Sequence, residues 1–141
     1  MKRATLVTAA ALMLSACGSF HLNPVTPARP IPIANFEVGY SPEIPQDRVN
    51  LLERIHMRTE VAAALRASYP VGAGPNVRVT ITQFISSRYG PTRMHMVAEV
   101  MTPNGVEATV EADATAVMGA SRGQLIEHVS QDCVNQIAQQ L

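Results

Sequence analysis

A histidine and an aspartate on two neighbouring predicted strands are the residues of this sequence best suited to chemistry. Residues 94–100 and 106–116 alternate apolar and polar side chains, which is typical of half-buried strands. A three-residue turn at 103–105 would put the apolar side chains of both strands on one face and His95 opposite Asp113 on the other. Such a pair can form two parts of a catalytic triad, but no serine or cysteine has a reason to join it. We therefore expect a solvated cross-strand pair and no enzyme.

Charged side chains gather on the exposed face of the same two strands. The candidate residues are Arg93, His95, Glu107, Glu111 and Asp113. A row of this kind often serves only to keep a sheet face soluble. Mixed charges can also set the orientation and choice of a docked partner, so we treat these five residues as a possible partner-binding face.

The cysteines and histidines do not form a recognisable metal-binding pattern. The sequence has two cysteines and four histidines, with no Cys-x-x-Cys or His-x-x-x-His spacing and no glycine-rich phosphate loop. Cys133 lies on the apolar stripe of a predicted helix, which favours a small buried side chain; a reactive or pairing thiol is the alternative. We expect no metal and no cofactor.

The composition excludes several classes of protein. A chain of 141 residues allows one ordinary domain. Eleven basic residues balance eleven acidic ones and only 4% of residues are aromatic, so the charge and stacking surfaces of a nucleic-acid-binding protein are missing. At 47% hydrophobic, the chain is too apolar to be disordered throughout.

The N-terminus has the features of a secretory signal. Lys2 and Arg3 precede an apolar run at 4–14, which is too short to span a bilayer of about 30 Å. Small residues follow and precede Cys17. Since Lys2 is the only lysine, removal of the signal would leave a domain that excludes Schiff-base chemistry.

The four residues Leu14-Ser15-Ala16-Cys17 resemble the lipobox of bacterial lipoproteins. The resemblance implies cleavage before Cys17 and acylation of its thiol and amine. Gly18, rather than aspartate, follows the cysteine, which by analogy with enterobacteria-like species favours the outer membrane over the inner one. The alternative is an ordinary secretory signal that is cut elsewhere and leaves a soluble periplasmic protein.

We expect three parts along the chain: a signal peptide at 1–16, a lipidated cysteine with a proline-rich tether at 17–33, and a single domain at 34–141. Four prolines between residues 24 and 32 predict a semi-rigid spacer that would reach roughly 50 Å from the membrane.

The domain pattern predicts an α+β fold. A strand at 35–40 precedes a helix at 46–69, and a second strand begins at 77 and contains a bulge near Gln83. The strands that carry His95 and Asp113 follow. A final helix begins at Ser121, with Gln124 completing a capping box. We expect a four-stranded antiparallel sheet with two helices on one face, in the order strand, helix, three strands, helix.

A lipobox, a spacer and this order of elements together look similar to small envelope accessory lipoproteins, such as the family of LPS-assembly lipoproteins. The resemblance covers topology only. It implies a lipid-anchored, non-enzymatic protein that binds the membrane through its acyl chains and also binds another envelope component. The alternative is a carrier that holds a small apolar ligand or lipid between helices and sheet.

Overall fold

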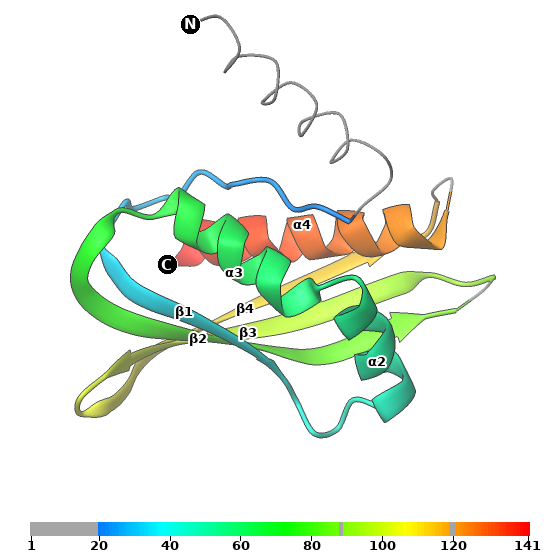
Figure 1. Cartoon of the computed structure of the whole chain (residues 1–141), viewed down its shortest axis with the longest axis horizontal. Coiled ribbons are helices and arrows are strands. Elements are labelled where there is room, and N and C mark those ends of the chain that lie inside the picture. Colours follow the sequence, from blue (N-terminus) through cyan, green and yellow to red (C-terminus); the bar gives the residue numbers. More distant parts are fainter. Residues whose placement is uncertain (1–19, 88, 119–120) are drawn as a thin grey trace, which may run out of the picture.

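The computed structural model describes residues 20–87, 89–118 and 121–141. The predicted signal peptide at 1–16 and the predicted lipidation site Cys17 lie outside these residues. The elements are β1 (Ile33–Tyr40), α2 (Gln46–Arg54), α3 (Met57–Ser68), β2 (Val71–Ser86), β3 (Thr92–Thr102), β4 (Gly105–Ala116) and α4 (Arg122–Gln140). The strands form one sheet in the order β1-β2-β3-β4, and α3 and α4 lie across one of its faces (Figure 1).

The first strand pair differs from the expected antiparallel sheet. β1 runs parallel to β2, while β2, β3 and β4 pair antiparallel as predicted. The chain between β1 and β2 passes through α2 and α3, and such a helical crossover returns the chain to the end of the sheet where it started. The next strand therefore runs in the same direction.

The single helix expected at 46–69 is two helices, which makes three in the described residues rather than two. The helical path breaks at His56, whose φ of 58° is the left-handed conformation that side chains rarely adopt. The buried positions on either side of the break are Leu52 in α2 and Met57, Val61 and Leu65 in α3, whereas Ile55 at the break is only half-buried. Residues 46–69 contain no glycine or proline, so the sequence gives no signal for the break.

The hydrophobic core lies between the helices and the sheet. The apolar stripe predicted around Cys133 is confirmed, since Ile126, Val129, Cys133 and Ile137 of α4 and Leu141, which follows it, are all buried. Small side chains on β4 (Ala112, Ala114 and Ala116) and methionines on β3 (Met94 and Met96) face it. The cap of α4 is also confirmed, because the Ser121 hydroxyl oxygen accepts a hydrogen bond of 3.2 Å from the backbone N–H of Gln124.

The register of β3 and β4 was predicted correctly, but the turn between them was not. His95 is paired with Asp113, as expected. Thr102 pairs with Gly105, so the turn has two residues, not three. The extra residue needed to keep the apolar faces together is Glu107, which bulges out of β4. Gly105 has a φ of 114°, a conformation that glycine adopts without strain.

The bulge expected near Gln83 is confirmed in β2. Ile81 pairs with Met96 and Gln83 with His95, which leaves Thr82 as the extra residue. The bulge moves Phe84 onto the buried face, where it is 1% exposed.

Residues 20–32 do not extend away from the domain as the predicted spacer would. They run along the seam between α3 and α4 (Figure 1). The backbone N–H groups of Leu22 and Val25 donate to Glu60 and Ser68 of α3, at 3.1 and 2.7 Å. On the other side, the N–H of Ala28 donates to a carbonyl of α4 at 3.0 Å. Leu22 is 2% exposed and belongs to the core, so this segment is part of the domain.

Candidate functional site

The face of the sheet that points away from α3 and α4 is the first candidate site, and we call it the outer face. No helix of the described chain lies over it (Figure 1). Glu37, Arg78 and Glu99 form one row across three strands. Arg78 Nε lies 3.4 Å from a carboxylate oxygen of Glu99. The outer face therefore presents alternating charges to solvent.

Two of the predicted partner-binding residues, Arg93 and Asp113, form an ion pair. Arg93 donates two hydrogen bonds to the Asp113 carboxylate, from Nη2 at 2.7 Å and from Nε at 3.2 Å. These bonds hold the pKa of the Asp113 carboxyl below its usual range and raise the pKa of Arg93. The two residues are diagonal rather than opposite in the register, since Arg93 pairs with Thr115. The long arginine side chain spans the diagonal.

His95 is opposite Asp113 in the backbone register, but the two side chains have different partners. The Nδ1 atom of His95 lies 2.5 Å from the hydroxyl oxygen of Thr82, the bulged residue of β2. The same hydroxyl donates to the His95 carbonyl at 3.2 Å. Because Asp113 is engaged by Arg93, the arrangement lacks the His–carboxylate bond of a triad.

The five predicted face residues do not form one cluster. Arg93, His95 and Asp113 lie together, and Glu111 is one row away, opposite Val97. Glu107 lies towards the β3–β4 turn, where it lines a depression of about 470 Å³ with Gly74, Pro75 and Met101 among others. The candidate residues are thus spread along β3 and β4 rather than gathered in a compact site.

The free edge of β4 is occupied by glutamines, which sequence reasoning missed. Gln136 of α4 accepts a hydrogen bond from the Asp113 N–H at 3.0 Å and donates one to the Asp113 carbonyl at 2.8 Å. Gln140 donates to the Glu111 carbonyl at 2.7 Å. These amides take the place of a further strand along this part of the edge, which hinders pairing with another chain.

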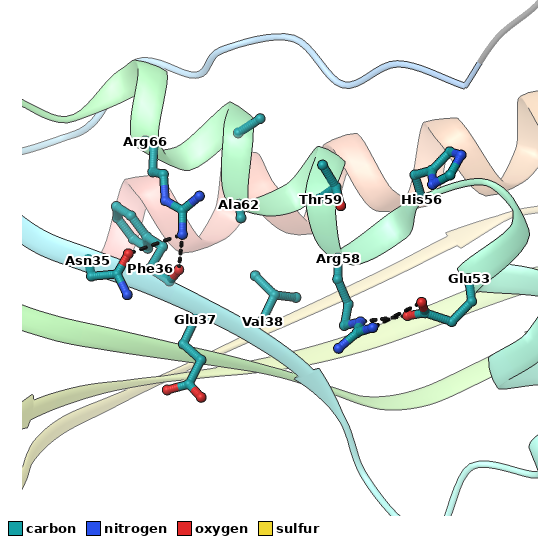
Figure 2. A pocket seen from close by; sticks show the side chains of 11 residues that line it. Asn35, Phe36, Glu37, Val38, Glu53, His56, Arg58, Thr59, Ala62 and Arg66 are labelled. Carbon is teal, nitrogen blue, oxygen red and sulfur yellow. Dashed lines mark hydrogen bonds and ion pairs between the residues drawn. The ribbon is translucent and has the colours of Figure 1, made fainter.

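A groove lies along the free edge of β1, beneath α3 (Figure 2). It has a volume of about 410 Å³. Arg66 reaches across it and donates to the Phe36 carbonyl at 3.0 Å and to the Asn35 side chain at 3.0 Å. This contact blocks one backbone acceptor of the β1 edge.

A second polar contact in the groove joins Arg58 and Glu53. Arg58 donates to Glu53 from Nε at 2.5 Å and from Nη2 at 3.0 Å (Figure 2), which lowers the pKa of the Glu53 carboxyl. The Arg58 guanidinium also lies 5.7 Å from the centre of the Tyr40 ring. Burial is the main cause of the raised pKa of Tyr40. Both arginines of the groove are therefore held by polar contacts with neighbouring residues.

The buried thiol and the core offer no reactive group. Cys133 is fully buried, donates to the Met94 carbonyl at 3.5 Å, and has its pKa raised to about 12, chiefly by burial. Side chains such as Leu65, Met96 and Ile137 fill the space between helices and sheet, and no observation favours the carrier alternative. In the described ranges, no three His, Cys, Asp or Glu side chains are grouped so as to hold a metal ion.

Comparisons with known proteins show only distant likenesses. No family model matches the chain. No curated protein matches it either. A dodecameric PelC variant from Paraburkholderia phytofirmans is 14% identical, with a TM-score of 0.45, over 85% of this chain and 95% of that one. A protein from Xanthomonas campestris is 11% identical, with a TM-score of 0.48, over 86% of this chain and 88% of that one. At TM-scores below 0.5, these likenesses say nothing about the activity of this chain.

The first prediction concerns the glutamine that covers the β4 edge. Replacing Gln136 with alanine should lower the free energy of unfolding by about 1–2 kcal/mol, because two hydrogen bonds to the backbone of Asp113 are lost. Gln139 is a matched control, since it is exposed on the same helix and its replacement brings the same gain in helix propensity. Urea denaturation measures both variants. Equal stability of Gln136→Ala and Gln139→Ala would show that the edge contact contributes nothing.

Proposed function

We propose that this protein is a bacterial lipoprotein, anchored by acyl chains on Cys17, that binds another envelope protein through its outer face. The observation that carries the proposal is a mixed-charge sheet face that is left uncovered while the opposite face is fully packed against helices. We infer a non-enzymatic role, because three arginines of the two candidate sites, Arg78, Arg93 and Arg58, are each held in an ion pair with a carboxylate.

The anchor part of the proposal rests on the sequence. Cys17 ends the lipobox-like sequence, and two or more acyl chains are enough for stable attachment to a bilayer. Gly18 after the cysteine favours the periplasmic side of the outer membrane. Within the part of the chain that the structure describes, none of the helices combines the length and apolar character that crossing a membrane requires.

The proposal of a partner rests on two features of the outer face: its charged side chains are held in fixed positions, and the face is accessible. Complementary charges on a partner would meet an ordered pattern, because Arg93 and Asp113 hold each other in place and Arg78 is paired with Glu99. The segment at 20–32 runs along the helical side of the domain, so the anchor leaves from that side and the outer face stays open.

The anchor is tested by metabolic labelling with palmitate in cells that make the full-length protein. Replacing Cys17 with serine should abolish the label and move the protein from the membrane fraction to the soluble fraction, because the acyl chains are lost. Cys133→Ala is the matched control and should keep both label and membrane attachment, since its thiol is buried. A Cys17→Ser variant that retains the label would contradict the anchor.

The partner face is tested by a charge exchange that keeps its ion pair. In the double variant Arg93→Asp/Asp113→Arg, the pair is restored with reversed polarity, so stability should be nearly unchanged while the face meets its partner with the wrong charges. A photoreactive residue at Thr109, on the same face opposite Glu99, should give a partner adduct in intact cells that falls about tenfold in the double variant.

Two controls separate recognition from folding in this experiment. A photoreactive residue at Ala67, which is exposed on α3, should give no adduct with that partner. Thermal unfolding of the double variant should match the parent protein. If the Thr109 adduct persists at full yield after the charge exchange, or forms equally from Ala67, the outer face is not the binding surface.

A further inference from the structure

The three most exposed large apolar side chains of the described residues lie at one end of the sheet. Tyr89, Val117 and Met118 are 93, 72 and 88% exposed. Tyr89 belongs to the loop between β2 and β3, whereas Val117 and Met118 follow β4 directly. Strand pairing brings these loops to the same end, since Thr92 pairs with both Ser86 of β2 and Ala116 of β4.

The start of α4 ties the two loops together. Arg122 donates to the Ser86 hydroxyl at 2.7 Å and to its carbonyl at 3.3 Å. Val117 and Met118 line a shallow depression of about 370 Å³ together with Leu125 and His128 of α4. The three exposed side chains at this end of the sheet, Tyr89, Val117 and Met118, are together called the apolar end below.

The chain also leaves the described domain at this end. The backbone N–H of His21 lies 3.5 Å from Glu127, which is next to His128 in α4. The described chain therefore begins beside the N-terminal half of α4 (Figure 1). Cys17 precedes Phe20 by three residues, and an extended chain of that length spans at most about 10 Å. Acyl chains on Cys17 would thus enter the membrane close to the apolar end.

We propose that the side chains of the apolar end insert into the lipid surface beside the acylated cysteine. Their insertion would orient the domain with the apolar end towards the membrane and the opposite end of the strands away from it. This inference rests on the lipid anchor proposed above. Apolar and aromatic side chains favour the boundary between headgroups and acyl chains, and the anchor holds them within reach of it. The β3–β4 turn, with its half-exposed Val106, lies at the opposite end of the strands and would point away from the membrane.

The absence of tryptophan from the chain allows a direct test. Met118→Trp and Val106→Trp each introduce one fluorophore, at the apolar end and at the far turn respectively. The full-length acylated variants are placed in vesicles of phosphatidylethanolamine and phosphatidylglycerol, with or without bromine on the acyl chains. Bromolipids should quench the Met118→Trp emission at least about twofold more than the Val106→Trp emission, and only Met118→Trp should shift to shorter wavelength.

Flotation of the same vesicles separates this inference from the anchor on which it depends. If neither variant floats with lipid, the lipid anchor is wrong and the inference falls with it. If both float but the two tryptophans are quenched equally, the anchor stands and the inference is overturned. The Met118→Trp emission could instead already be at short wavelength without lipid, in a protein that is dimeric. That result would show that the apolar end binds a second copy of the chain, and it would also overturn the inference. Val117→Trp provides a second probe at the same end.

Discussion

The segment at 20–32 is bound in the seam between α3 and α4. This contact determines which surfaces of the domain would face the membrane and which would face away from it. The segment forms hydrogen bonds with both helices in alternation, from Leu22 to α3, from Asn23 to α4, from Val25 to α3 and from Ala28 to α4. The point at which the chain leaves the domain is therefore fixed to the start of α4. A lipid anchor at Cys17 would hold the domain close to the membrane surface, whereas a free spacer would allow it to move tens of ångströms away.

The remaining surfaces of the sheet follow from the way the helices cover it. Helices α3 and α4 bury one face, and their side chains also reach both edges, with Arg66 on β1 and Gln136 on β4. Edge strands that carry such contacts are poor templates for pairing with other chains. The outer face and the apolar end are left uncovered by this arrangement of α3 and α4. One is charged and the other apolar, which suits a protein partner and a lipid surface respectively.

Local patterns in the sequence predicted the parts of the fold that depend on near neighbours. The stripe of α4 and its Ser121 cap follow from a period of 3.6 and a capping sequence. The parity of the apolar positions correctly paired His95 with Asp113, although the extra residue is a bulge at Glu107 rather than a longer turn. The parallel pairing of β1 was missed because strand direction depends on the crossover through α2 and α3 and not on the pattern within the strand.

The candidate site was predicted less well than the fold. The strand register shows which residues are opposite one another, but it does not show which residues their side chains contact. The arginine at 93 extends diagonally to Asp113, and His95 turns instead to Thr82, which only the bulge brings near. Gln136 was missed because a polar residue on a helix normally indicates solvent rather than a strand edge. The prolines at 24–32 favoured the prediction of a spacer. The packing of this segment against the domain was missed because a single buried leucine produces no periodic pattern in the sequence.

Hydrogen exchange of the full-length protein, followed by mass spectrometry, tests the central claim most directly. The claim is that the segment next to the anchor is an integral part of the domain. Peptides that cover residues 20–28 should exchange at least about a hundredfold more slowly than an unstructured chain, because the amides of Leu22, Asn23, Val25 and Ala28 are hydrogen-bonded to the helices. Exchange of these peptides at the rate of an unstructured chain, while α3 and α4 stay protected, would contradict this claim. It would support instead the tether that the sequence predicts.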